Sequence, residues 1–467
     1  MRPILLTTIL VSGVATGYSQ FKNSLQAAAP TGDRNERPSS ADSLSIKPAS
    51  AGKYWIAGAE AAGSNVAVWA FFRYAENESY TRISLKAIED HLKTGFWWDQ
   101  DGFLGNQFNH PYHGSVYFNS ARSNGLGFWE SAAYSLGGSA MWELFMEVEP
   151  PSYNDIVNTP VSGIILGEII HRSTNLILDP SKRGLGRVLR EASALLLNPV
   201  KGFNRAMSGE MWSTGSPSSN PDYKLWLSLG GNDLFFNRTF VQNHGYGLAR
   251  LDMEYGDLLA PSSHHEPFDY FNLRVELGFS ANDDILSIVA SGVLWDRTVT
   301  LFDHSSTVLG IYKEFDLHNN LACHLTATSC AFRLTNVMPV SSTTTFQSSV
   351  SISGVFMGGV NSPYAPVYHE QYNMGPGASA KVTAALKNND HGSVYVNYKR
   401  FWLHTLNGAD GDEFVGMLNL GTNYQITKTI MAGIDLVLYE RYSVYEHFPD
   451  VKSGISSIHL YTKFSLN

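Results

Sequence analysis

Residues 271–280 read Phe-Asn-Leu-Arg-Val-Glu-Leu-Gly-Phe-Ser and alternate strictly between two chemical classes. The odd-numbered positions are all apolar, whereas the even-numbered positions are polar, charged or glycine. Successive side chains of a β-strand point to opposite faces, so this stretch predicts a strand with one apolar and one hydrophilic face. Its length also fits a tilted strand that crosses a membrane, which needs about 9–11 residues.

The same two-residue period continues from about residue 222 to the end of the chain. In residues 246–257, the two faces are Leu251, Met253 and Tyr255 against Arg250, Asp252 and Glu254. Pairs such as Asn282-Asp283 and Asn407-Gly408 separate these segments and favour hairpin turns. The pattern indicates about twelve antiparallel strands. Because backbone polar groups must all be paired inside hydrocarbon, we expect the sheet to close into a transmembrane β-barrel over residues 222–467.

Composition favours a membrane protein over a nucleic-acid-binding one. Aromatic residues make up 12% of the chain and charged residues only 16%, against about 25% in soluble domains. A net charge of −9 argues against nucleic acid as a partner, because phosphate binding needs clustered cations. A soluble β-sandwich also has alternating strands and is the competing interpretation. Strand length and aromatic residues near strand ends, such as Tyr398 and Trp402, favour the barrel.

The start of the chain predicts export. Arg2 followed by the apolar run Ile4–Val14 indicates a signal peptide over residues 1–19, with an uncleaved anchor as the alternative. Residues 20–52 are rich in Ala, Ser and Pro and predict a disordered tether. An exported barrel is expected in the outer membrane of a Gram-negative bacterium. Its expected partners are outer-membrane lipid and the barrel-assembly machinery, and no oligomer is indicated.

Residues 53–210 carry helical signals and predict an N-terminal helical module, so the fold class is α+β. The expected helices lie near residues 54–74, 84–94, 113–123, 128–146 and 154–172. Ser84 and either Ser152 or Asn154 are placed to cap helix starts. Gly163 and Gly167 share one helical face and permit close approach of a neighbouring helix.

Several long motifs resemble an uncharacterised bacterial family, the domain of unknown function numbered 3943. They include residues 110–119 (His-Pro-Tyr-His-Gly-Ser-Val-Tyr-Phe-Asn), Phe128–Ser131, Gly138–Glu143, Tyr372–Gly377 and Arg441–Tyr445. The resemblance spans roughly residues 54–467. It implies a place in the Gram-negative outer membrane, but the family has no established activity and implies no mechanism.

Polar residues of the helical module are the candidates for chemistry. The sequence has no nucleophile elbow, His-Glu-x-x-His motif or phosphate-binding glycine loop. His110, His113, Glu143 and Asp155 are the candidate catalytic residues, because imidazole and carboxyl groups can exchange protons with a substrate. The alternative is a structural network, since buried charges must be paired.

Four further polar residues of the module are candidate binding residues: Asn119, Arg122, Glu168 and His171. Glu168 and His171 have the spacing found in di-iron carboxylate bundles, but no second Glu-x-x-His follows. We therefore expect no metal and no cofactor.

The hydrophilic face of the strands is expected to line the barrel lumen with Arg250, Asp252, Glu254, Arg274, Glu276 and Asp435. These residues can pair with one another across strands or form a charged pore wall. A twelve-stranded lumen is narrow and can be filled by side chains or by the helices.

The hypothesis is an outer-membrane barrel with a lumen-inserted helical plug or a periplasmic module, acting in envelope maintenance or in handling small solutes or lipid. A lipid-modifying enzyme and a narrow solute pore are the alternatives, and an enzymatic role is the less favoured.

Overall fold

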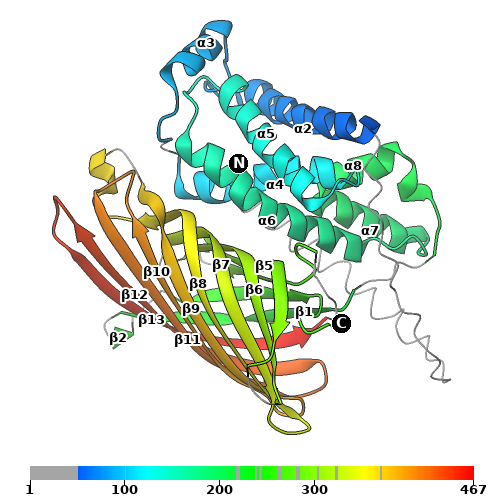
Figure 1. Ribbon diagram of the computed structural model, residues 1–467, viewed down its shortest axis with the longest axis vertical. Helices are drawn as coiled ribbons and strands as arrows, with labels where there is room; N and C mark the ends of the chain where they lie inside the picture. The colour runs from blue at the N-terminus through cyan, green and yellow to red at the C-terminus, as the bar shows by residue number, and fades with distance from the viewer. Residues whose placement is uncertain are drawn as a thin grey trace.

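A helical module packs against a β-barrel in the computed structural model (Figure 1). The structure describes residues 51–99, 101–216, 221–236, 239–240, 245–260, 266–279, 284–301, 304–320, 324–368 and 371–466. The predicted signal peptide, residues 1–19, lies outside the described residues, as does the predicted tether up to residue 50.

Twelve long antiparallel strands form a closed barrel within the described residues. They are β1 (Tyr223–Phe236), β3 (Tyr246–Tyr255), β4 (Phe271–Phe279), β5 (Asp284–Val299), β6 (Ser306–Asn319), β7 (His324–Pro339), β8 (Thr344–Asn361), β9 (Tyr372–Asn388), β10 (Gly392–His404), β11 (Gly411–Gln425), β12 (Ile430–Tyr445) and β13 (Val451–Ser465). Within the described residues, the two-residue β2 (Thr239–Phe240) pairs with the end of β1 alone, and a short helix η4 (Ala365–Tyr368) follows β8. Pairing of β1 with β13 closes the sheet, which confirms the predicted barrel.

The strand alternation divides the barrel wall into an inner and an outer face. Arg250 on β3 bonds to Asp435 on β12, although β13 and β1 separate these strands in the sheet. Only side chains that point into the lumen can meet in this way. The opposite face carries exposed apolar side chains around much of the barrel, including Leu229, Phe332, Ile352, Val394, Leu420, Ile434 and Leu460.

The first described helix of the module begins two residues before the predicted boundary. Its helices are α2 (Ala51–Phe71), η1 (Phe72–Glu76), α3 (Leu85–Thr94), η2 (Gly105–Asn109), α4 (His110–Arg122), α5 (Phe128–Phe145), α6 (Tyr153–Ile177), α7 (Gly184–Leu197), α8 (Pro199–Met207) and η3 (Glu210–Trp212). Ser84 and Ser152 cap α3 and α6 as predicted, whereas α7 and α8 had no distinct signal in the sequence pattern. Among the described helices, none has the length and apolarity needed to cross a bilayer.

Two glycines of α6 allow α4 to pack closely against it, as the sequence predicted. A Cβ atom on Gly163 would lie 2.6 Å from the Cα of Gly114 on α4. A Cβ atom on Gly167 would lie 2.7 Å from the ring of Phe118. These separations are too short for any side chain, so the backbone of α6 lies directly against the backbone of Gly114 and the ring of Phe118.

The module covers the outer face of the barrel wall, and this corrects the expectation of a helical plug in the lumen. Ile165 and Ile169 of α6 share a buried core with Ile288, Phe315 and other barrel residues. Phe315 lies between Glu314 and Asp316, whose side chains point into the lumen, so Phe315 itself faces outward. Ser162 of α6 also bonds to outward-facing Thr328 at 2.5 Å. The helices therefore lie beside β3–β9, where apolar strand positions offer them a surface to bury.

Gly163→Ala should destabilise the helical module by about 1–3 kcal/mol, because the new methyl group collides with the backbone of α4. Thermal unfolding followed by helical circular dichroism measures the change. Gly137→Ala on α5 is the matched control, since no atom lies within 4 Å of the added Cβ. It should leave stability unchanged or raise it by up to about 1 kcal/mol. Equal effects of the two substitutions would contradict the close packing of α4 on α6.

Candidate functional site

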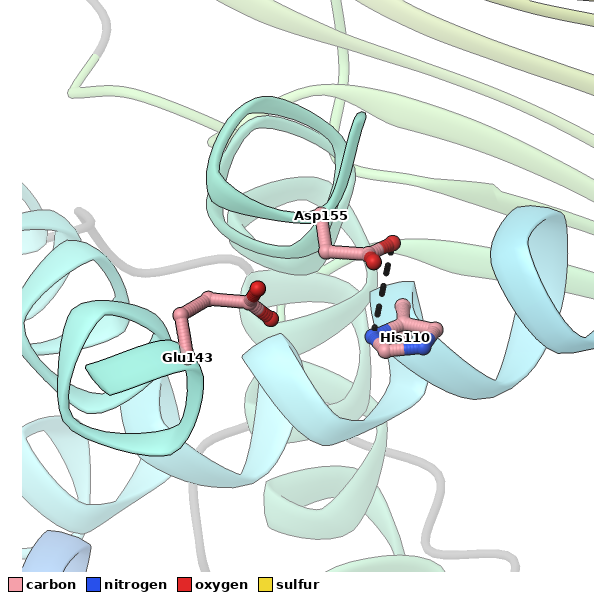
Figure 2. Close-up of side chains that lie close together, drawn as sticks. All are labelled: His110, Glu143 and Asp155. Atoms are coloured by element: carbon pink, nitrogen blue, oxygen red, sulfur yellow. Dashed lines mark ion pairs between the residues drawn. The ribbon is translucent and has the colours of Figure 1, made fainter. Parts of the chain in front are cut away.

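Three of the candidate catalytic residues come together where α4, α5 and α6 meet. His110 is the first residue of α4, Glu143 lies in the last turn of α5, and Asp155 lies in the first turn of α6. One ligand atom from each lies within 4.8 Å of the others. Figure 2 shows the two carboxyl groups and the imidazole directed toward one another. We call these three residues the His110 cluster.

Hydrogen bonds hold the two carboxyl groups in place. The backbone N–H of Ser152 donates to Glu143 Oε2 at 2.8 Å. Ser152 Oγ accepts from the N–H of Asp155 at 3.0 Å and also bonds to Asp155 Oδ2. Asn154 Nδ2 donates to Asp155 Oδ1 at 3.1 Å. The start of α6 thus fixes both acids, and helix N-termini favour carboxylates.

Charge and burial shift the pKa values of the cluster strongly. Burial alone would lower the pKa of His110, but Asp155, Asp101 and Glu143 outweigh burial and raise it to about 10. Burial and then repulsion from Asp155 raise the pKa of Glu143 to about 8. Burial raises the pKa of Asp155 to about 6, although His110 favours its charged form. A carboxyl group that titrates near neutral pH can serve as a proton donor or acceptor.

The His110 cluster adjoins an open pocket of about 560 Å³ between the module and one end of the barrel. Asp101, which precedes the pocket residue Gly102, lies 3.8 Å from His110 Nε2 and has 61% of its side chain exposed. The side chain of His110 is 18% exposed, whereas Glu143 and Asp155 are buried. The remaining lining comes from Phe103, Leu104, Gly105, Asn109, Asn319, His324, Asn361, Gln371 and Tyr372.

His113 lies apart from the cluster, although the sequence placed it in the same candidate set. Its ring packs at 4.6 Å from the ring of Tyr117 and at 5.1 Å from that of Trp142. Its Nε2 lies 3.0 Å from the Tyr117 hydroxyl, which also bonds to Asn65. Burial and then the charge of His110 lower the pKa of His113 to about 3. In this position a neutral His113 packs α4 against α5 and α2.

The four candidate binding residues lie away from the His110 cluster, toward the C-terminal end of α4 and the part of α6 beside it. Three of them, Asn119, Arg122 and Glu168, form hydrogen bonds between helices. Glu168 is fully buried and accepts bonds from Arg122 at 2.7 and 2.8 Å and from Arg172 at 2.8 Å. Asn119 donates to the Gly167 carbonyl and accepts from Asn198. His171 Nδ1 has no hydrogen-bond partner within the described part of the chain. The carboxylate of Glu168 is therefore paired with two arginines.

The six predicted lumen residues occupy the inner face of the barrel, mostly as ion pairs. Arg250 bonds to Glu276 at 2.8 Å and to Asp435 at 2.9 Å. Arg274 bonds to Asp252 at 2.6 Å. Glu254 lies 3.4 Å from Lys224.

Sequence reasoning missed three residues around the cluster: Asp101, Asn106 and Tyr372. In the amide orientation that satisfies its neighbours, Asn106 donates to Asp155 Oδ1 and accepts from the Tyr372 hydroxyl of β9. Asp101 gave a weak signal as one of two acids directly before a helix. The contact with Tyr372 gave none, because it depends on how the module docks on the barrel.

Residues 95–200 match the family model described as a domain of unknown function (DUF3943). This match confirms the resemblance over these residues, which include all eight candidate catalytic and binding residues of the module. Among curated proteins, none matches this chain.

Solved structures similar to this chain are β-barrels of outer membranes. The NanC porin has a TM-score of 0.29 and 10% identity, covering 51% of this chain and 98% of the porin. An outer membrane channel from Pseudomonas putida F1 has a TM-score of 0.27 and 7% identity, covering 54% of this chain and 99% of the channel. OmpT, an outer membrane protein of Vibrio cholerae, has a TM-score of 0.25 and 10% identity, covering 53% of this chain and all of OmpT.

Glu168→Gln should lower the stability of the helical module by about 3–5 kcal/mol, because it leaves two largely buried arginines without their shared carboxylate. Thermal unfolding of the full chain in detergent measures the loss. Glu89→Gln is the control, since Glu89 and its partner Lys93 are both mostly exposed. Such a surface pair contributes about 0–1 kcal/mol. A loss at Glu168 no larger than that at Glu89 would contradict the structural role of the Arg122–Glu168–Arg172 group.

Proposed function

We propose that this protein is an outer-membrane barrel with a closed lumen, which holds a helical module at the membrane for work on envelope lipid. In this proposal the barrel anchors the chain in the membrane and provides the surface on which the module docks, and the module performs the function. The observation that carries it is the division of the barrel surface: paired charges fill the inside, while the module occupies part of the outside.

The lumen is filled by charged side chains that bond to one another across it. Besides the Arg250 group, Lys381 on β9 bonds to Glu314 at 2.8 Å and to Asp316 at 2.6 Å on β6. Lys399 on β10 bonds to Asp316 at 2.7 Å. Asp316 and Asp435 are fully buried, and Glu314 is 1% exposed. A water-filled pore would leave such groups hydrated, so their burial supports a plug made of side chains.

Toward one end of the lumen, an apolar group adds to this filling. Leu325, Ala327, Phe401, Leu403 and Val415 form a buried cluster inside the wall. Ala327 lies opposite Asp316 in the strand register, and Asp316 points inward. Apolar contact and ion pairing together leave little room for a solute.

Exposed apolar side chains support a membrane position for both parts of the chain. The outer face of the barrel presents the apolar residues named above, as expected for strands in contact with lipid. The module, docked on the same wall, also exposes large apolar side chains, including Trp55, Ile56, Trp129, Leu136, Val188, Leu195 and Phe203. Apolar area on this scale is uncommon on a soluble surface and supports lipid as the partner of the module.

Wild-type protein inserted into planar bilayers should show no stepwise ion conductance, because the lumen is closed by paired charges. Insertion is verified separately by heat-modifiable migration of protein recovered from the same membranes. Stable conductance steps in the wild type, altered when Arg274 or Glu276 is neutralised, would support a solute pore and overturn the closed-lumen proposal.

A lipid-modifying enzyme is the second candidate function. The convergence of His110, Glu143 and Asp155 beside an open pocket favours it, since these groups can move protons at a substrate bound there. The pocket lies where the module meets the end of the barrel. In this candidate function, a lipid headgroup is the substrate that enters it.

Under this second candidate, Glu143→Gln should abolish a change in envelope lipid composition that the wild type produces. Mass spectrometry of lipid extracts from cells that produce each variant measures it. His113→Asn is the control, because His113 lies outside the cluster and should leave the change intact. Identical lipid profiles with wild-type protein, with Glu143→Gln and with no protein would remove the enzyme from consideration.

A further inference from the structure

We infer that the His110 cluster is a binding site for one divalent transition-metal ion, with His110, Glu143 and Asp155 as its ligands. The inference stands apart from the proposed function, since a metal here can be structural or catalytic. It replaces the expectation of no metal, which rested on the Glu168–His171 pair.

The first support is geometric. One imidazole nitrogen and two carboxylate oxygens lie within 4.8 Å of one another, from three different helices (Figure 2). Metal–ligand bonds to histidine nitrogen and carboxylate oxygen are about 2.0–2.2 Å long, so three ligand atoms around one ion lie about 3–3.6 Å apart. His110 Nδ1 and Asp155 Oδ1 already lie 3.7 Å apart. Closing the three atoms on an ion at their centre requires the longest separation to shorten by about 1 Å.

The second support is an imbalance of buried charge. Glu143 is 1% exposed and Asp155 is 3% exposed. Glu143 forms no ion pair within the described residues, and the ion pair of Asp155 is with His110 alone, at 3.7 Å. Two buried carboxylates thus share one imidazole, and an uncompensated buried carboxylate costs several kcal/mol.

The third support is the orientation of His110. Its Nδ1 faces Asp155, while its Nε2 faces Asp101 Oδ2 at 3.8 Å. Histidine ligands almost always direct their second nitrogen to a carboxylate, carbonyl or water, which fixes the ring and makes it a stronger ligand. Asp101 lies outside the three ligands and occupies this supporting position.

The ligand types narrow the choice of metal. One imidazole and two carboxylates suit Zn²⁺, Mn²⁺ or Fe²⁺, whereas Ca²⁺ takes about 6–8 oxygen ligands. Three protein ligands also leave coordination positions for water or substrate, as in catalytic zinc sites. The partly exposed His110, next to the pocket residue Asn109, gives the ion a route to that pocket.

A proton on Glu143 would relieve the same charge imbalance, so the test must separate a metal from a proton. Full-length protein in detergent is stripped with a chelator and titrated with Co²⁺, whose visible absorption reports its ligands, and then with Zn²⁺ as competitor. The wild type should bind one Co²⁺ and gain thermal stability on binding. Failure of the wild type to bind Co²⁺ or Zn²⁺ with a stoichiometry of one would overturn the inference without reference to any variant.

Three variants and one control locate the site. Glu143→Gln and Asp155→Asn should lose the Co²⁺ spectrum and the metal-induced stabilisation. The metal-free stability of Glu143→Gln should equal or exceed that of the wild type, because Glu143 is buried and forms no ion pair within the described residues. Asp101→Asn changes a mostly exposed residue and should weaken binding roughly 10–100-fold.

Glu147→Gln is the matched control, because this acid lies close to Glu143, outside the three ligands, and bonds to Trp142 Nε1. It should bind Co²⁺ as the wild type does. Unchanged binding in Glu143→Gln and Asp155→Asn would show an adventitious surface ion and would contradict the inference.

Discussion

The burial of one side of the barrel wall beneath α6 determines the arrangement of the whole molecule. Strands β3–β9 present outward-facing apolar side chains, and α6 covers them with Ile165, Ile169 and their neighbours. Removing this apolar area from water stabilises the docking of the module on the wall. It also brings η2 and the start of α4 to the barrel end, where Gln107 Nε2 donates to the Tyr372 hydroxyl at 3.3 Å. The position of the His110 cluster follows from this docking.

Because the helices occupy the outside, the lumen is filled by the barrel's own side chains. A twelve-stranded barrel is narrow enough for opposite strands to bond through lysine and arginine. Charged residues that point into the lumen pair in this way: Arg250 with Glu276 and Asp435, and Lys381 with Glu314 and Asp316. The His110 cluster differs, since its two buried acids share a single imidazole. This difference separates a structural network from a candidate site.

Local patterns predicted the strands well, because the direction of each side chain alternates with residue number whatever the strand packs against. For the same reason they did not predict where the helices dock. Phe315, which lies under the module, and Ile352, which is exposed, occupy equivalent apolar positions in their strands. The sequence pattern also did not predict which charged residues pair across the lumen, because this pairing depends on the stagger of strands that are not neighbours in the sheet.

The candidate site was predicted in part. The sequence singled out His110, Glu143 and Asp155 as polar residues of apolar helices, but it could not rank them against His113. His110 and His113 lie one helical turn apart, and only the packing of three helices decides which of them meets the acids. Asp101 was missed because it lies in a connecting segment without periodicity.

Disulfide trapping between α6 and the barrel wall tests the central claim most directly. In a background with Cys323→Ser and Cys330→Ser, the pair Ser162→Cys and Thr328→Cys should cross-link under mild oxidation, because their hydroxyl oxygens lie 2.5 Å apart. The pair Ser162→Cys and Ser329→Cys should not, because Ser329 points inward and bonds to Glu314. Cross-linking of Ser162→Cys to position 329 instead of 328, or to neither, would contradict docking of the module on the outer face of the barrel.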